Sequence, residues 1–460
     1  MFLLIPACII SLLIATGGAF AQKASSKSLT SAPQPQNTIH LFNGKNLDGW
    51  YTFIKDRGRD KDPKSVFTVK DGMLSISGEE WGCITTDKEF ENYKLVAEYK
   101  WGNKTYGTRA NRTRDNGFLL HSIGEDGGYD GTWMRSIEIN IIEGGTGDLL
   151  VVGDETNRFL ITCPVAPQKQ NGSYIFQPGG DPVNENYARV NWIGRDPNWK
   201  DEKGFRGIND VENPAGEWNR LECIVNGDQM SVYLNGTLVN QALFVRPSKG
   251  RIQIQSEGAE ISYRRVDLTP LPPAPSYIPE GYKSLFNGKD LTGWKKHGTE
   301  NWYAQNGEII CESGRAKKFG YLSTIKEYKD FILDVNYKQE ANGNSGIFVR
   351  STIDGTAITG WQVEVANMDE HSGGIYESGK GGRGWLIQPD PQNEKILREG
   401  EWNHMRIKVK GNEVTTWLNG TQMIHLNDNK FGAGKGFIAL QIHDGGGIKV
   451  RWKDLHIKEL

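Results

Sequence analysis

HLFNGKNLDGW, the stretch at residues 40–50, is repeated later in the chain as SLFNGKDLTGW at residues 284–294. A second motif recurs in the same order. GEWNRLECIVNGDQMSVYLNG starts at Gly216, and GEWNHMRIKVKGNEVTTWLNG starts at Gly400. The recurrence of two motifs in one order indicates two copies of a single domain.

The two copies differ in length. Their front motifs are 244 residues apart and their back motifs 184, so copy one carries about 60 extra residues between its motifs. These include segment 167–207, whose Gly, Pro and Asn content is typical of surface loops. The five prolines of LTPLPPAPSYIPEG favour a stiff, extended linker. We therefore predict domains at 39–271 and 281–460, joined by a linker at 272–280.

Composition limits the class of partner. The chain of 460 residues has a formal net charge of −2 and a pI near 6.5, which argues against nucleic acid or a polybasic membrane contact. Most of the 14 tryptophans are expected in the core. However, flat aromatic rings also pack on the C–H faces of sugars, so a small carbohydrate stays open as a partner.

The first 38 residues are expected to lie outside the folded domains. Residues 1–21 form an apolar run that ends in an A-x-A cleavage pattern at Ala19–Ala21, which predicts a signal peptide. Residues 22–38 have the polar, Pro- and Ser-rich composition of a flexible tether. We expect a periplasmic or secreted protein with no membrane span after signal removal. A transmembrane anchor and a lipid attached to Cys8 remain alternatives.

Four cysteines lie within the predicted domains: Cys83, Cys163, Cys223 and Cys311. Two of them sit in strand-like, apolar contexts, and no C-x-x-C pattern appears, so buried free thiols are favoured over disulfides. The sequence shows no required cofactor and assigns no metal ligands. A structural Ca²⁺ is the one metal left open.

Apolar and polar residues alternate with a period of two in both copies. The segments in copy one are 93–101, 136–142 and 251–256, and those in copy two are 331–338, 361–365 and 413–420. Each is bounded by Gly, Asn or Asp, and no long stretch has a helical period. Many short alternating segments of this kind predict an all-β fold, a β-sandwich or jelly roll.

The order of motifs in copy two resembles the 3-keto-disaccharide hydrolase family of exported bacterial proteins. The motifs are LFNG-x-x-L-x-G-W, NSGIFVR, GWQVEV, SGGIYESG, GRGWL, GEWN, WLNG and IALQIHDGG. The resemblance implies two tandem concanavalin-like jelly-roll β-sandwich domains, with copy one a different branch. It also implies sugars oxidised at C3, cleaved at the glycosidic bond by hydrolysis or elimination. The matched motifs add these candidate substrate-binding residues: Asn344, Trp361, Tyr376, Arg383 and Trp385.

Polar residues of unusual type share one predicted sheet face in copy two. Strict alternation puts Arg350, Gln362, Glu364, Gln441 and His443 on the face opposite the apolar residues of the same strands. A plain solvated face would instead be rich in Lys, Thr and Ser. We therefore predict a site here, with His443 or Glu364 as a base and the amides and guanidinium as substrate contacts.

Copy one has an analogous but different set. His121 takes the place of Arg350, and Glu138 and Asn140 take the places of Gln362 and Glu364. The residues in the places of Gln441 and His443 are Gln255 and Glu257. His121 and Glu138 are the candidate acid–base pair of this copy. Because the ionisable groups differ, the two copies need not share a substrate.

Two alternatives to cleavage of keto-sugars stay open. Glu138-x-Asn140-x-x-Glu143 resembles the catalytic strand of laminarinase-type glycosidases, which would make copy one a two-carboxylate retaining enzyme. Jelly rolls also serve as lectins, so the chain is alternatively a non-catalytic tandem carbohydrate-binding protein.

Overall fold

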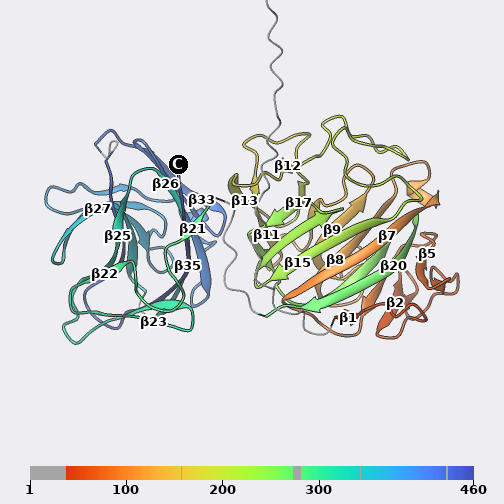
Figure 1. The fold of residues 1–460 in the computed structure, drawn as a ribbon, viewed down its shortest axis with the longest axis horizontal. Coiled ribbons are helices and arrows are strands. Elements are labelled where there is room, and N and C mark those ends of the chain that lie inside the picture. The colour runs from red at the N-terminus through yellow and green to blue at the C-terminus, as the bar shows by residue number, and fades with distance from the viewer. Residues whose placement is uncertain (1–37, 157, 273–280, 342, 431–433) are drawn as a thin grey trace, which may run out of the picture. The chain divides into compact units, whose positions relative to one another are not determined.

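The computed structural model of the protein describes residues 38–272 and 281–460, except for 157, 342 and 431–433 (Figure 1). The predicted signal peptide and most of the predicted tether and linker lie outside these residues. The six alternating segments all form strands: β7 (Tyr93–Thr105), β9 (Arg135–Ile142), β19 (Arg251–Ser256), β26 (Phe331–Ala341), β28 (Ala357–Val365) and β32 (Glu413–Leu418).

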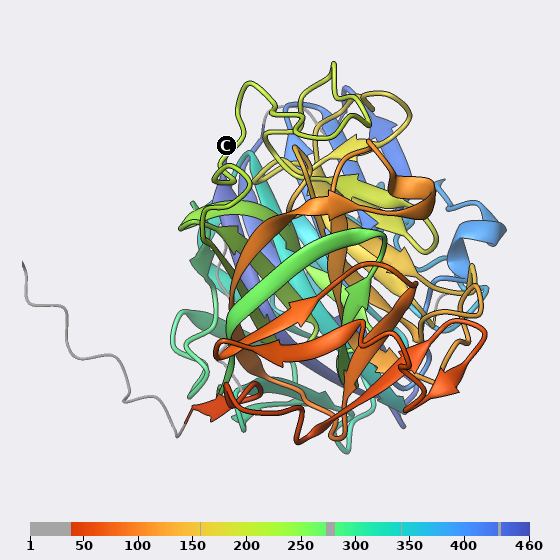
Figure 2. The same cartoon turned by 90° about the vertical axis from the view of Figure 1, so that its right-hand side faces the viewer.

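The described residues form two β-sandwich domains, and each sandwich has a front sheet and a back sheet. We call front the sheet that carries the candidate site residues. The back sheet of domain one has the order β17-β16-β15-β7-β20-β5-β4, with β1 beside β20. Its other strands are β17 (Thr237–Ala242), β16 (Gln229–Leu234), β15 (Asn219–Asn226), β20 (Ala259–Pro270), β5 (Met73–Ile76), β4 (Phe67–Lys70) and β1 (Ile39–His40). Figure 2 shows β20, in green, between β7 and β5.

The front sheet of domain one has the order β12-β14-β10-β9-β8-β19-β6-β2-β3. Its other strands are β12 (Tyr174–Ile175), β14 (Arg189–Asn191), β10 (Leu149–Val152), β8 (Asp115–Ile123), β6 (Gly82–Thr86), β2 (Trp50–Ile54) and β3 (Gly58–Arg59). The insertion is more regular than the loops we expected. Segment 167–207 supplies β12, β14 and β13 (Asp181–Glu185). In a small third sheet β13 pairs with β11 (Leu160–Val165), which in turn pairs with β18 (Phe244–Arg246).

Domain two repeats this plan. Its back sheet, β23-β24-β35-β26-β31-β32-β33 with β21 beside β35, matches that of domain one strand for strand, and its front sheet is β22-β25-β34-β27-β28-β29-β30. The remaining back strands are β23 (Asn301–Gln305), β24 (Glu308–Glu312), β35 (Lys449–Glu459), β31 (Trp402–Lys410), β33 (Thr421–Asn427) and β21 (Lys283–Ser284). The remaining front strands are β22 (Trp294–His297), β25 (Gly320–Tyr328), β34 (Gly436–Ile442), β27 (Ser345–Asp354), β29 (Ile375–Ser378) and β30 (Gly384–Ile387). Helix is confined to η1 (Gly107–Arg109) and α1 (Pro391–Glu394) within the described residues.

Each domain has its own apolar core between its two sheets. The core of domain one includes Trp101 and Tyr263, and that of domain two includes Trp302 and Trp452. Cys83, Cys163, Cys223 and Cys311 are buried and free of disulfide bonds, as predicted. The two repeated sequences therefore fold by burying two separate apolar surfaces.

Because the cores are separate, each domain is expected to fold without the other. Expression of residues 38–272 and 281–460 as two proteins should give two soluble, β-rich products by circular dichroism. Each should unfold in one cooperative thermal transition. Two halves that both fail to fold would show that the domains depend on each other.

Candidate functional site

A cavity of about 700 Å³ lies on the front sheet of domain two. This volume is within the usual range for small-molecule sites and is large enough for a disaccharide. Seven of the residues predicted from the sequence line it: Asn344, Gln362, Glu364, Tyr376, Trp385, Gln441 and His443. The front sheet therefore gathers most of the copy-two candidates into one pocket.

Strand alternation explains how the floor of this pocket forms. In β28, Val363 and Val365 point into the core while Gln362 and Glu364 face the pocket. Gly346 of β27 pairs with Glu364 on one side and with Gln441 on the other. A Cβ at Gly346 would lie 2.7 Å from Cγ of Gln362, so a glycine is needed for that side chain to lie across the sheet.

The three floor side chains form a short hydrogen-bonded chain. Nε2 of Gln441 donates to Oε1 of Gln362 at 3.4 Å, and Nε2 of Gln362 donates to Oε2 of Glu364 at 2.8 Å. Each of the two amide nitrogens has a second hydrogen with which to bind a ligand oxygen. Oδ1 of Asn344 is buried beside them with no partner among the described residues.

Burial decides the protonation of Glu364. The residue is 7% exposed, and loss of hydration raises the pKa of its carboxyl to about 8. The hydrogen bond from Gln362 lowers this pKa, and the charge of Glu370 raises it further. Glu364 therefore holds its proton at neutral pH and can donate it to a ligand oxygen.

His443 follows the end of β34 at the rim of the pocket. Its Nδ1 lies 2.8 Å from Oδ1 of Asp444, and its ring contacts the edge of Phe319 with ring centroids 4.4 Å apart. The side chain is 37% exposed. His443 is thus accessible to a ligand while one of its nitrogens is engaged.

Sequence reasoning missed a loop with ionisable side chains in the lining of the pocket. The loop after β28 brings Asp369, Glu370 and His371 into the lining. Its backbone is tied to the floor, because the amide of Gly373 donates to the carbonyl of Glu364 at 2.9 Å. The signal in the sequence was a His after two acidic residues, two positions before the Gly373-Gly374 pair and six positions after Val365, where a predicted site strand ends.

An aromatic wall stands beside this loop. The ring of Trp385 meets the rings of Tyr376 and His371 edge to face, with centroids 5.4 Å and 5.2 Å apart. Trp385 is 39% exposed. It offers a ring face of the kind that packs against a sugar.

The prediction that Arg350 lies on the site face is wrong. A register shift in β27 and a φ of 47° at Arg350 interrupt the alternation, so the side chain leaves the pocket face. Its guanidinium donates to the carbonyl oxygens of Lys329 and Gly411 and to Asp330, each at 2.7 Å. Arg350 therefore ties together loops and strand ends and does not contact the pocket.

Two further candidates lie away from the pocket. Trp361 is 2% exposed and belongs to the core of domain two, because it points to the same side of β28 as Val363 and Val365. Arg383, in the turn before β30, pairs with Glu377 and, at 2.7 Å, with Asp428. Neither side chain lines the pocket, and their role in substrate binding stays a prediction.

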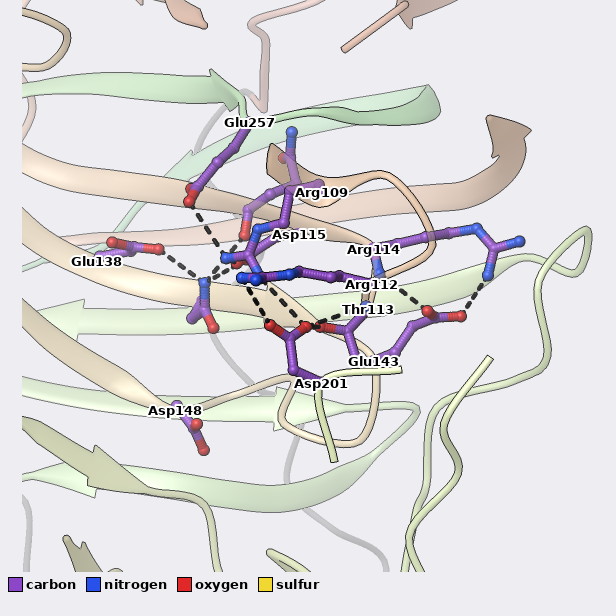
Figure 3. Close-up of polar contacts among 12 residues, drawn as sticks. Arg109, Arg112, Thr113, Arg114, Asp115, Glu138, Glu143, Asp148, Asp201 and Glu257 are labelled. Atoms are coloured by element: carbon purple, nitrogen blue, oxygen red, sulfur yellow. Dashed lines mark hydrogen bonds and ion pairs between the residues drawn. The ribbon is translucent and has the colours of Figure 1, made fainter. Parts of the chain in front are cut away.

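Domain one also gathers its predicted polar residues, but into a more enclosed cluster (Figure 3). Nδ2 of Asn140 donates to Oε1 of Glu138 and to Oδ1 of Asp115, both at 2.9 Å. Arg109 from η1 pairs with Asp115 and lies 3.4 Å from Oε1 of Glu257. Glu138 and Asn140 are only 5% and 2% exposed.

The two glutamates of this cluster influence each other. Burial raises the pKa of Glu138, and burial together with the nearby Glu138 charge raises the pKa of Glu257 to about 8. A Cβ at Gly117 would lie within 2.7 Å of Oε1 of Glu138 and within 2.5 Å of Oε1 of Gln255, so both side chains lie over this glycine. Glu138 and Gln255 thus lie side by side over Gly117, with Glu257 close enough to feel the charge of Glu138.

The carboxyl group occupies different positions in the two domains. Glu138 pairs with Leu119, whereas Asn140 pairs with Gly117. In domain two the corresponding pairs are Gln362 with Phe348, and Glu364 with Gly346. The acid and the amide have therefore exchanged places along equivalent strands.

The prediction that His121 is a catalytic partner of Glu138 is wrong. Like Arg350, His121 has a positive φ, 54°, next to a register shift, and its side chain turns away from the site face. The residue is fully buried, and its Nδ1 lies 2.7 Å from the carbonyl oxygen of Pro247. Burial lowers the pKa of His121 to about 4, so the ring is neutral at physiological pH.

Glu143 is also removed from the site. Its carboxylate pairs with Arg114 (Figure 3) and accepts a hydrogen bond from the amide of Gly204 at 2.9 Å. The indole of Trp199, also in the insertion, donates to the carbonyl oxygen of Glu143 at 2.9 Å. Glu143 therefore braces the insertion, and the predicted pairing of Glu138 with Glu143 in a retaining glycosidase is wrong.

Metal and membrane features were searched over the same described residues. No group of three or more His, Cys, Asp or Glu side chains in that part of the chain is placed to hold a metal ion. None of the helices described there is long and apolar enough to cross a membrane.

Fold and site together define a tandem jelly-roll β-sandwich protein with a polar pocket on one sheet. The chain matches the family described as the 3-keto-alpha-glucoside-1,2-lyase-like domain over residues 37–269 and again over 281–458. The chain belongs to this family, which confirms the resemblance seen in its motifs.

Individual relatives are more distant. A 3-keto-disaccharide hydrolase of Bacteroides thetaiotaomicron is 27% identical over 169 residues, which are 29% of this chain and 55% of the relative. The chain thus spans about half the length of that relative. A protein of Parabacteroides distasonis, provisionally assigned as a glycosyl hydrolase, is 25% identical over 39% of this chain and 94% of its own, with a TM-score of 0.31. A carbohydrate-binding module of Bacillus subtilis is 12% identical over 36% of this chain and 96% of its own, with a TM-score of 0.30.

Proposed function

We propose that domain two cleaves the glycosidic bond of 3-keto-sugars of disaccharide size. The observation that carries this proposal is Glu364, a carboxyl group buried at the floor of a sugar-sized pocket beside two amide donors. Family membership supports the same chemistry.

The chemistry follows from the ketone. A carbonyl at C3 acidifies the hydrogen on C2, so a base can remove that proton, and the electron pair forms an enolate with its charge on the C3 oxygen. When the enolate collapses, the C3 carbonyl re-forms, a C1=C2 double bond forms and the C1–O bond breaks. The departing oxygen takes a proton from an acid. Later addition of water to the double bond gives net hydrolysis.

Residues of the pocket can protonate the departing oxygen, stabilise the enolate and orient the sugar ring. Glu364 donates the proton to the departing oxygen. The free amide hydrogens of Gln362 and Gln441 stabilise the enolate oxygen, with His443 beside them. Trp385 packs against the sugar ring and orients it.

Domain one is proposed to act on a different ligand or to bind without turnover. Its carboxyl lies at another position along the strand, its site is enclosed by Arg109, and its histidine points away. A two-carboxylate mechanism there would have to use Glu138 with Glu257, because Glu143 is engaged elsewhere.

The function is tested by incubating the full chain with a 3-keto-disaccharide and following products by mass spectrometry. His443→Ala is expected to lower turnover at least tenfold, about 1.4 kcal/mol in activation free energy. The matched control is His425→Ala, an exposed histidine on β33 outside the pocket lining, which should leave turnover unchanged.

Two results would contradict the proposal. One is wild-type protein that binds the unmodified disaccharide as tightly as its 3-keto form and cleaves neither, which would identify a binding module. The other is equal turnover by the His443→Ala variant and the wild type, which would remove His443 from the site.

A further inference from the structure

Domain two contains a buried carboxyl group that the proposed chemistry does not use. Glu394 is the last residue of α1 and is only 2% exposed. A glutamate is rarely buried to this extent unless its carboxyl group has a partner. Its Oε2 accepts the backbone amide of His371 at 2.9 Å, and its Oε1 lies 3.3 Å from Nδ1 of the same residue. One buried carboxyl group thus holds the backbone and the ring of a single pocket histidine.

Local structure fixes Glu394 in place. The side chain of Asp390 caps α1 by accepting the amide of Gln392 at 2.8 Å, and Pro391 occupies the first helical position. Directly after the helix, Ile396 and Leu397 are buried in the core of domain two. The carboxyl group is therefore held on a short but anchored element.

His371 is held from its other sides as well. It adopts a φ of 69°, and its carbonyl accepts the amide of Gly374 at 2.8 Å. The backbone of Gly374 in turn accepts the amide of Glu364 at 3.0 Å, which ties the loop to the acid on the pocket floor. Trp385 contacts the edge of the imidazole.

We propose that Glu394 is a positioning residue that orients His371 as the base for the C2 proton of the 3-keto-sugar. Because a carboxylate can only accept a hydrogen bond, Nδ1 of His371 carries the hydrogen in its bond with Glu394. In the neutral ring Nε2 is then free to accept a proton. The carboxylate also stabilises the imidazolium that forms. The C2–H bond breaks, its proton moves to Nε2, and its electron pair enters the enolate of the proposed reaction.

The other pocket histidine is less well arranged for this task. The carboxylate that faces His443 belongs to Asp444, whose side chain is 51% exposed, so solvent screens that interaction. Glu394 is screened far less because it is buried. This contrast favours His371 as the base and leaves His443 as a donor to the enolate.

This inference rests on the proposed function, and its test therefore includes a measurement that needs no substrate. ¹⁵N NMR of the full chain with labelled histidine should show the His371 ring as the Nδ1–H tautomer. Glu394→Ala, which removes the acceptor, should shift that ring toward the Nε2–H tautomer. Glu413→Gln, which changes an exposed acid on β32 outside the pocket lining, is the control and should leave the tautomer unchanged.

Kinetics with a 3-keto-disaccharide supply the second measurement. Glu394→Gln keeps the shape and the acceptor oxygen but loses the charge, so kcat should fall at least tenfold while KM stays within about twofold. Glu394→Asp should recover part of kcat. His371→Gln should lose at least a hundredfold in kcat, within the range for removal of a general base.

An Nε2–H tautomer in the wild type, or unchanged kcat in Glu394→Gln, would overturn the inference. If the wild type turns over no 3-keto-disaccharide, the proposed function fails and the role of His371 as a base fails with it. The NMR result would still decide whether Glu394 positions the ring.

Discussion

Glu364→Gln is expected to lower turnover of a 3-keto-disaccharide by about a thousandfold, because the substitution removes the proton that the departing oxygen needs. This corresponds to about 4 kcal/mol in activation free energy and lies within the usual range for general acid catalysis. Glutamine keeps the volume of the side chain and can still accept the 2.8 Å hydrogen bond from Gln362. KM should therefore change little, and steady-state kinetics of the two proteins separate the two parameters.

The pH dependence gives this prediction a second readout. Since the pKa of Glu364 is about 8, wild-type kcat/KM should fall as the pH rises through 8, and the small residual activity of Glu364→Gln should not. The raised pKa also means that the folded state holds this proton more tightly than the unfolded state. The resulting stability is fully present below about pH 4 and is lost as the pH rises through 8.

Glu364→Gln should accordingly lose less stability than the wild type between pH 5 and pH 9, as measured by denaturant unfolding at each pH. Ser378→Ala, at another position in the pocket lining, is a suitable control for changes in shape alone. Wild-type activity that stays level through pH 8 would show that Glu364 is not the proton donor.

Arg350→Ala is expected to destabilise domain two by about 3 kcal/mol. The side chain is 2% exposed and donates to two backbone carbonyls and to Asp330, so its removal breaks three hydrogen bonds and leaves a space where the guanidinium was packed. The denaturation midpoint of domain two should fall. At a temperature where the variant is folded, turnover should stay within about threefold of the wild type.

This variant separates the two interpretations of Arg350. A substrate-binding arginine would instead show a large rise in KM with little loss of stability. Arg315→Ala, which changes an exposed arginine of the same domain, is the control and should affect neither quantity.

Much of the fold followed from the sequence because repetition and alternation are local signals. The repeated motifs predicted two copies, and the period of two predicted β7, β9, β19, β26, β28 and β32. The insertion was harder to predict. Its Gly and Pro content suggested loops, yet pairing with the rest of domain one gives it short strands, and tertiary contacts of that kind are not visible in a local pattern.

The site was predictable only where strands are regular. Alternation correctly grouped Gln362, Glu364 and Gln441 in the pocket. It failed at Arg350 and His121 for one shared reason, a register shift with a positive φ, since one irregular residue reverses the faces of those that follow.

His371 was missed for a different reason. It lies on a loop, where no period assigns a face, and its partner Glu394 is 23 residues further along the chain. Trp361 was named as a candidate because it lies in a matched family motif, although it points to the same side of β28 as Val363, which already predicted the core.

The exchange of acid and amide between Glu138 and Glu364 has a consequence for inhibitor design. The two positions differ by two residues along equivalent strands, which is about 7 Å of strand length. A compound that places a basic atom against one carboxyl cannot reach the other in the same pose. Selective ligands for either half of this chain are therefore attainable, and a ligand that occupies only one half would report on that half within the intact protein.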